Sequence, residues 1–150
     1  REPSRALQFS ADSVNTQSSP SARGVSAIKM VPEDPLVSAA FVEPGAEWSV
    51  VAASRGGLVK RLPLSEFPLQ GRAGKGVQLW KITASSGPLS AAVAVRPDER
   101  LDVLYADGTS TPLQPAGIPL STRASRGMAL PPSASGRSAV VAGLAVRPAD

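Results

Sequence analysis

Apolar positions along the chain fall into short runs that are separated by residues typical of turns. Two pairs of runs flank a glycine turn, residues 49–53 with 58–62 and residues 101–105 with 109–113. The second turn contains Asp107-Gly108, a strong hairpin signal because a tight hairpin turn requires positive φ angles. The pattern therefore predicts two strand–turn–strand hairpins.

The other apolar runs also predict strands. Residues 77–82 alternate apolar and polar side chains, as a strand with one buried face does. Residues 89–95 are almost uniformly small and apolar, which is typical of a strand covered on both faces, and residues 36–42 and 140–146 are similar apolar runs. Helical periodicity is nearly absent, and the alanine-rich residues 91–94 lie too close to prolines to form a helix. The pattern indicates an all-β chain of many short strands.

Three landmarks recur along the chain at nearly constant spacing. A basic residue followed by glycine occurs three times, with the glycines 52 and 51 residues apart (Gly24, Gly76 and Gly127). The last valine of each long apolar run recurs after 53 and 51 residues, and the hairpin glycines, Gly57 and Gly108, are 51 residues apart. Landmarks that keep one register indicate an internal repeat of about 50 residues.

Four short strands in about 50 residues have the length and content of one propeller blade. We expect one repeat domain over residues 1–150, with units at 1–47, 48–100 and 101–150. The first unit begins after its first strand should have appeared, and the third ends soon after its last strand. Because unpaired strand edges invite strand addition, we expect either a neighbouring part of a longer protein or a second copy of the chain, as a homodimer, to cover the ends.

The composition excludes several kinds of chemistry. The chain has no Cys and no His, so zinc sites built on these residues, Ser-His-Asp triads, Cys-His catalysis and disulfides are excluded, and we expect no cofactor. No run of about 18 apolar residues occurs, which argues against a membrane partner. A chain without cysteine is typical of a cytoplasmic protein, and residues 1–15 lack the apolar stretch of a signal peptide. Since the chain does not begin with Met, we expect an excised or trimmed piece.

The charge of the chain is mildly basic. Sixteen Lys and Arg against twelve Asp and Glu give a net charge of +4, and twelve of the sixteen are Arg, which suits planar contacts with phosphate. Taken alone, this charge is equally compatible with a polyanionic partner and with a solvated basic surface. The acidic pairs Glu33-Asp34 and Asp98-Glu99 adjoin prolines and predict turns rather than an acid–base pair or a metal site.

The aromatic residues predict packing rather than chemistry. Tyr105 is the only tyrosine, and it ends an apolar run with no cluster of cations beside it in the sequence, so we expect a packing residue and not a covalent nucleophile. Trp48 and Trp80 are too few to serve as a base-stacking platform for single-stranded nucleic acid.

One loop combines glycines with cations, and its sequence is Gln70-Gly71-Arg72-Ala73-Gly74-Lys75-Gly76. Glycines let main-chain N–H groups approach an anion closely, and the Arg and Lys side chains add positive charge. Such a loop suits the phosphate backbone of DNA and has no means of reading bases. By composition alone, a basic glycine-rich loop is more often a solvated turn than a binding site.

The loop resembles the gyrase A box, whose pattern in the C-terminal domain of the DNA gyrase A subunit is Q-[RK]-R-G-G-[RK]-G. Five of the seven positions match, whereas Gly71 stands in place of a cation and Ala73 in place of a glycine. The preceding residues 57–67 are similar to the family's G-x-V-K-[KR]-x-x-L-S-E-F run. The chain thus resembles the C-terminal domain of a type IIA topoisomerase A subunit, of either DNA gyrase or topoisomerase IV.

This resemblance implies a β-pinwheel, a propeller-like fold of four-stranded blades. In that family a positively charged rim binds and bends duplex DNA, while catalysis belongs to other domains. The implied role is a non-catalytic accessory module, and the implied partners are double-stranded DNA and the remainder of the topoisomerase A subunit. One rival hypothesis is a protein-interaction propeller in which the DNA-binding box has decayed and the acidic loops dock a partner.

The resemblance and the repeat together predict a DNA-binding rim. The predicted rim consists of Gln70, Arg72, Gly74, Lys75, Gly76, Lys60, Arg61, Arg123, Arg126 and Arg23. Lys60 and Arg61 are adjacent on a predicted strand and point to opposite faces, so at most one of them should reach DNA. Neutralising about five to seven phosphates would make the logarithm of the binding constant fall with the logarithm of salt concentration at a slope of roughly −4 to −6. We expect any preference among DNA sequences to come from bendability.

Overall fold

The computed structural model describes residues 4–131, 133 and 140–149, so parts of the first and third predicted units lie outside the described residues. The described strands are β1 (Ser4–Ala6), β2 (Ser49–Ser54), β3 (Leu58–Pro63), β4 (Val77–Trp80), β5 (Leu89–Val95), β6 (Arg100–Tyr105), β7 (Ser110–Leu113), β8 (Met128–Ala129) and β9 (Val141–Arg147). The described 3-10 helices are η1 (Ala11–Ser13), η2 (Leu64–Glu66) and η3 (Pro115–Gly117). The prediction of an all-β chain is confirmed. Within these ranges, no helix has the length and apolar character needed to cross a membrane.

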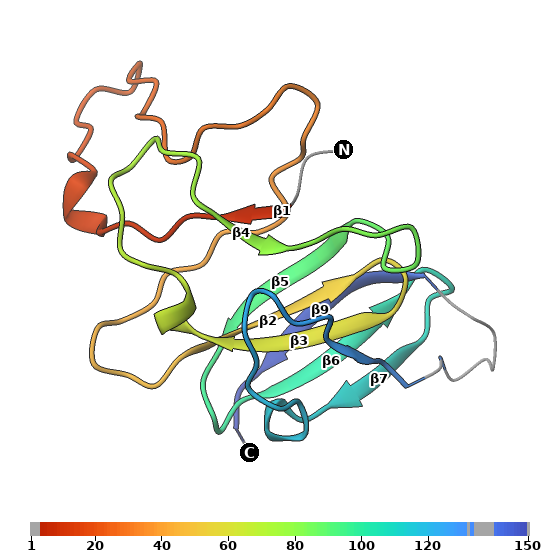
Figure 1. Cartoon of the computed structure of the whole chain (residues 1–150). Helices are drawn as coiled ribbons and strands as arrows, with labels where there is room; N and C mark the ends of the chain where they lie inside the picture. Colours follow the sequence, from red (N-terminus) through yellow and green to blue (C-terminus); the bar gives the residue numbers. More distant parts are fainter. Residues whose placement is uncertain (1–3, 132, 134–139, 150) are drawn as a thin grey trace.

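The strands form three antiparallel sheets (Figure 1). The largest sheet has the order β5-β2-β3-β8, the second has the order β7-β6-β9, and the smallest pairs β1 with β4. The two predicted hairpins are β2–β3 and β6–β7. Their turns contain Gly57 and Gly108, with φ angles of 90° and 85°, as the hairpin interpretation requires.

Two strands cross from one unit to another. By sequence β4 belongs to the second unit, but it pairs with β1 of the first, and β8 of the third unit pairs with β3 of the second. Val77 lies opposite Ala6, and Met128, 51 residues after Val77, lies opposite Val59. Each of these strands completes the sheet of the preceding unit, an exchange that the hydrophobic pattern did not predict.

The four-stranded sheet is covered on both faces. Successive side chains of a strand point to opposite faces, so Val51 and Ala52 of β2 enter different hydrophobic clusters. Val51 packs with Leu101 of the β7-β6-β9 sheet, whereas Ala52 packs with Trp80 of the β1-β4 sheet. This sandwiched position explains why β2 and β5 consist of apolar residues apart from serines and carry no charged side chain.

The repeat recurs in the loops as well as in the strands. The helices η1, η2 and η3 begin 53 and 51 residues apart. The glycines of the basic–glycine landmark, Gly24, Gly76 and Gly127, all adopt the left-handed conformation, with φ angles of 72°, 68° and 86°. The spacing seen in the sequence therefore corresponds to a repeated backbone conformation.

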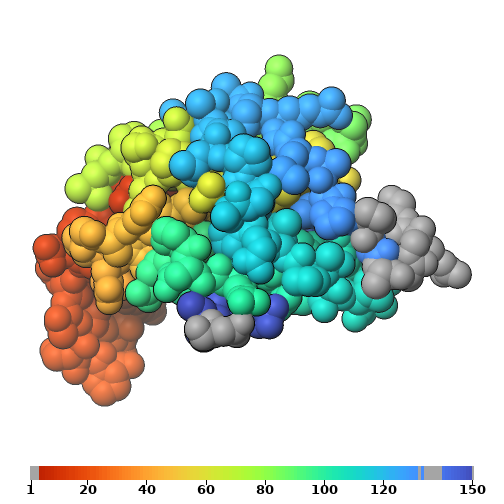
Figure 2. Space-filling model, turned by 90° about the horizontal axis from the view of Figure 1, so that it is seen from below, coloured from red at the N-terminus to blue at the C-terminus, as the bar shows by residue number. Residues whose placement is uncertain are grey.

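Residues 36–42 do not form a strand, which corrects the prediction made from their apolar character. They are irregular and exposed, with Leu36 at 66% and Phe41 at 72% of full accessibility. Their counterparts β5 and β9 each pair with the first strand of a hairpin, β2 and β6, and among the described residues no strand takes that place beside residues 36–42. In the space-filling view the first unit, coloured red to orange, forms a lobe at one side of the molecule (Figure 2). An apolar run without a hydrogen-bonding partner does not become a strand.

Candidate nucleic-acid interface

The box loop, residues 70–76, lies against the first unit. The Gln70 N–H donates to the carbonyl of Gln8 at 2.9 Å, while the side chain of Gln70 stays exposed. The third-unit loop, residues 121–127, is fixed to the second unit in the same manner, through the Ser121 N–H and the carbonyl of Arg61 at 2.9 Å. Each loop is therefore positioned by the unit that precedes it.

A second segment of the first unit lines the box loop. The Ala73 N–H donates to the carbonyl of Ala27 at 2.7 Å, and the Lys29 N–H donates to the carbonyl of Gly74 at 2.8 Å. Ala73 has a φ of 64°, a left-handed conformation that a glycine adopts without strain. The backbone thus explains why the box pattern has glycine at a position where this chain has Ala73.

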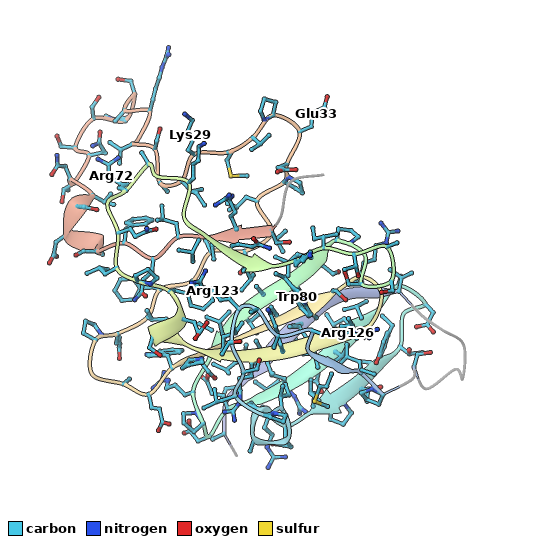
Figure 3. All side chains as sticks on the ribbon, viewed as in Figure 1. Lys29, Glu33, Arg72, Trp80, Arg123 and Arg126 are labelled. Carbon is cyan, nitrogen blue, oxygen red and sulfur yellow. The ribbon has the colours of Figure 1, made fainter. Side chains whose placement is uncertain are left out.

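Arg72 holds the box loop and the first unit together. Its Nε donates to the carbonyl of Ser13 at 3.2 Å and its Nη1 donates to the carbonyl of Ser26 at 2.7 Å. In Figure 3 Arg72 and Lys29 are seen in the same group of loops. These two bonds fix the box loop to the first unit. They use only part of a guanidinium that has five N–H donors, and a contact of the other donors with DNA stays a prediction.

Arg123 occupies the position of Arg72 in the third unit, 51 residues later, and is held in a similar way. Its main-chain N–H donates to the Glu66 carboxylate at 2.9 Å, and its side-chain Nε lies 3.7 Å from that carboxylate. Its Nη1 donates to the carbonyl of Gln78 at 3.2 Å. The side chain is 36% exposed. Arg72 and Arg123 therefore share a position at which arginine braces the loop against the preceding unit.

The most accessible predicted cations are Arg23, Lys75 and Arg126, which we call the repeat cations. All three are exposed, and each stands directly before a glycine in the left-handed conformation. The preceding residues turn the chain, and the two later glycines, at positions 76 and 127, lead into β4 and β8. The same backbone geometry thus presents one cation per unit to solvent.

Lys60 is buried, which removes it from the predicted rim. Its side chain is 1% exposed, and its ammonium donates to the carbonyls of Arg123 and Ser125 at 2.8 and 3.3 Å. The ammonium also lies 4.8 Å from the centre of the Trp80 ring, at a distance typical of a cation–π contact. Lys60 points beneath the third-unit loop and fixes that loop to β3.

Arg61 also has an internal role. Its side chain is half-buried, and its Nε donates to the carbonyl of Ile118 at 2.7 Å, just after η3. The expectation that adjacent residues point to opposite faces holds for Lys60 and Arg61, but each face is covered by a segment of the third unit. A strand pattern predicts the direction of a side chain and not what lies in front of it.

Burial lowers the pKa of Lys60 from its ordinary value of 10.5 to about 8, an effect that Glu66 opposes and Arg123 reinforces. A lysine whose pKa is lower in the folded chain leaves the unfolded chain with more bound protons between these two values, so stability increases with pH in that window. Below pH 8 both states carry the charge and the cost of burying it is present in full. Relative to a Lys60→Met variant, the wild-type free energy of unfolding should increase by about 2 kcal/mol between about pH 8 and pH 10.

Urea unfolding at a series of pH values measures this difference, and a variant at exposed Lys29, Lys29→Met, is the matched control. A difference between wild type and Lys60→Met that does not change with pH would contradict the assignment of a buried, titrating ammonium.

The remaining predictions about single residues concern packing and turns. Trp80 and Tyr105 are 4% and 5% exposed, and the Tyr105 hydroxyl donates to the carbonyl of Pro131 at 2.7 Å, so the packing roles are confirmed. The Glu99 carboxylate accepts the Arg96 N–H at 2.8 Å across a turn, and Glu33 lies in a turn. Among the described residues, no cluster of acidic side chains could hold a metal ion.

Two cations beside the box loop, Arg5 and Lys29, were not predicted. Arg5 lies on β1, and its Nη1 donates to the carbonyl of Gly76 at 3.3 Å. Lys29 lies in the long loop of the first unit and reaches the box loop through its own N–H. One feature of the sequence could have identified Lys29 as part of the repeat, because Lys29 follows Arg23 by six residues as Lys81 follows Lys75.

Comparison with known proteins agrees with this geometry. The family model described as the DNA gyrase C-terminal domain, a β-propeller, matches residues 5–43 and 49–84. Among solved structures, the C-terminal domain of DNA topoisomerase IV superposes with a TM-score of 0.85 at 23% identity, over 97% of this chain and 44% of that chain. The DNA gyrase A C-terminal domain superposes with a TM-score of 0.74 at 18% identity, over 95% of this chain and 47% of that one. At these identities the two structures establish the fold, which confirms the predicted β-pinwheel.

Curated relatives are much longer than this chain. The DNA gyrase A subunit of Pseudomonas aeruginosa is 35% identical over 73% of this chain and 12% of its own length. The corresponding protein of Thermotoga maritima is 30% identical over 73% of this chain and 14% of its own length, and that of Klebsiella oxytoca is 27% identical over 97% of this chain and 16% of its own length. From the family match, the shared fold and the box loop together, we conclude that the chain belongs to the family of DNA gyrase C-terminal domains.

Proposed function

We propose that the chain is a non-catalytic module that binds and bends duplex DNA as part of the A subunit of a DNA gyrase or a topoisomerase IV. It contacts the phosphate backbone and does not read bases. The observation that carries the proposal is the repeat cations, one exposed Arg or Lys per unit, each before a left-handed glycine. Charges at equivalent points of successive blades suit a polymer whose phosphates recur at regular intervals.

The partner within the protein would be the remainder of the A subunit. Two features of the described residues could pair with it or pack against it, the outer edge of β7 and the unpaired apolar residues 36–42. An exposed strand edge with an apolar segment is a common place for a neighbouring part of a protein to pair. The rival hypothesis of a protein-interaction propeller needs acidic loops that are free to dock, and one of its two loops is already engaged, because the Glu99 carboxylate accepts a backbone N–H within its own turn.

Binding of a fluorescent duplex of about 40 base pairs, measured across a salt series, tests the proposal. The Lys75→Gln, Arg126→Gln double variant should bind about 10- to 50-fold more weakly near 0.1 M salt, and the magnitude of its salt slope should decrease by about 2. The matched control is the Arg55→Gln, Arg96→Gln double variant, which removes the same charge from exposed positions outside the box loops.

The control should stay within about threefold of wild type, because net charge alone acts weakly on a close contact at this salt concentration. If wild type binds no duplex even at low salt, the DNA-binding proposal is wrong for this chain. If both double variants weaken binding equally, general charge and not the repeat cations carries the attraction.

A further inference from the structure

A small basic pocket lies where the box loop meets the first unit. Its volume is about 80 Å³, and it is lined by Arg5, Lys29, Met30, Val31 and Lys75. This volume suffices for a few water molecules or for one tetrahedral anion. Three of its five lining side chains are cationic, and none of the described lining residues is acidic.

The backbone places these three cations together from three separate segments. The Lys29 N–H donates to the carbonyl of Gly74 at 2.8 Å, which puts Lys29 next to the residue that precedes Lys75. Arg5 approaches from β1, and its Nη1 donates to the carbonyl of Gly76 at 3.3 Å. Both bonds end on glycines that flank Lys75, so the pocket is built around that lysine.

None of the three cations forms an ion pair, with N···O within 4.0 Å, to another side chain in the described part of the chain. Arg5, Lys29 and Lys75 are exposed, and the ion pairs that the described residues form involve other side chains. Like charges held close together repel each other, and an anion between them removes that repulsion. Met30 and Val31 supply the apolar part of the lining.

We infer that this pocket is a phosphodiester-binding site, in which Arg5, Lys29 and Lys75 together hold one backbone phosphate of duplex DNA. The inference rests on the proposed function and adds two residues from outside the box. It also accounts for Gly71, which stands where the box pattern has a cation. In this proposal Arg5 and Lys29 add positive charge to the box loop from the preceding unit, through contacts at Gly76 and Gly74.

The test is a double-mutant cycle on binding of the same duplex. Lys29→Gln alone should weaken binding about three- to tenfold near 0.1 M salt and reduce the magnitude of the salt slope by up to about 1. Arg5→Gln should act in the same direction. If Lys29 and Lys75 hold one phosphate, Lys29→Gln should have a much smaller effect in a Lys75→Gln background, because interacting residues are not additive.

In an Arg126→Gln background the effect of Lys29→Gln should be undiminished, since Arg126 belongs to a different unit. Arg55→Gln is the charge-matched single control, and urea unfolding of each variant checks that the fold is retained. If Lys29→Gln and Arg5→Gln bind like Arg55→Gln while Lys75→Gln is impaired, the pocket is not a phosphate site and the proposed function stands. If wild type binds no duplex, both proposals are overturned.

Discussion

Alanine in place of Gly127 is expected to destabilise the chain by about 2–4 kcal/mol. The residue has a φ of 86°, and a Cβ added there would lie 2.7 Å from the carbonyl oxygen of Val59 and 3.0 Å from the Trp80 ring. The left-handed conformation costs an alanine about 1 kcal/mol, and overpacking adds about 1–3 kcal/mol because the nearer atom belongs to the backbone of β3. The strain falls where the third-unit loop crosses onto the second unit.

Gly108 is the matched control for this substitution. Its φ of 85° is nearly the same, but no described atom lies within 4 Å of the Cβ position, so Gly108→Ala should cost about 1 kcal/mol only. Denaturant unfolding of both variants, with the slope compared to exclude a change of transition, gives the two free energies. Equal losses at the two positions would mean that the contact of the Gly127 backbone with β3 has no energetic weight.

Alanine in place of Trp80 is expected to cost about 3–5 kcal/mol. The ring is 4% exposed and packs in one cluster with Leu62 and Leu79, while the Lys60 ammonium lies over its face. Trp80 ends β4, the strand that crosses to β1, so its removal opens a cavity between two units. Removing the ring also leaves the buried ammonium without its cation–π partner, a loss of about 1–2 kcal/mol that is included in the range.

Trp48→Ala is the control for Trp80→Ala. Trp48 is half-buried directly before β2, and the Arg96 guanidinium lies over its ring at 5.0 Å from the centre, so it has a cation–π contact of its own. We expect this control to lose less than half as much free energy of unfolding. A second variant, Trp80→Phe, keeps most of the packing and should recover much of the loss. If Trp80→Ala and Trp48→Ala have the same free energy of unfolding, the cluster of Trp80 with Leu62 and Leu79 does not stabilise the contact between the first two units.

Local signals were sufficient for the hairpins and for the repeat. The Asp107-Gly108 turn depends on nearest neighbours, since a turn needs a left-handed residue. The mostly apolar sequence of β5 was itself the signal of a strand covered on both faces. Residues 36–42 differ in composition from β5 only by one Phe in place of one Ala, but they lack a described strand beside them. Composition cannot distinguish these two cases because hydrogen bonding to a partner decides between them.

The candidate site was predictable only where it follows the repeat. Lys75 and Arg126 occupy equivalent positions and are both exposed; the box motif selected Lys75, and the repeat spacing then selected Arg126. Lys60 was misjudged because its ammonium is covered by a loop 63 residues further along the chain. Arg5 and Lys29 were missed for the converse reason, since they approach Lys75 only after the first unit has folded against the box loop.

The crossing of β4 and β8 into the preceding unit means that a boundary between repeats in the sequence is not a boundary in space. A chain cut between two repeats loses a strand from one sheet and leaves that strand without a partner on the other side of the cut. An inserted whole repeat, by contrast, contributes one strand that pairs with the preceding unit and one sheet edge that pairs with a strand of the following unit. No strand is then left without a partner. Such a chain can therefore gain or lose complete repeats in evolution without breaking a strand pairing, whereas gaining or losing part of a repeat breaks one.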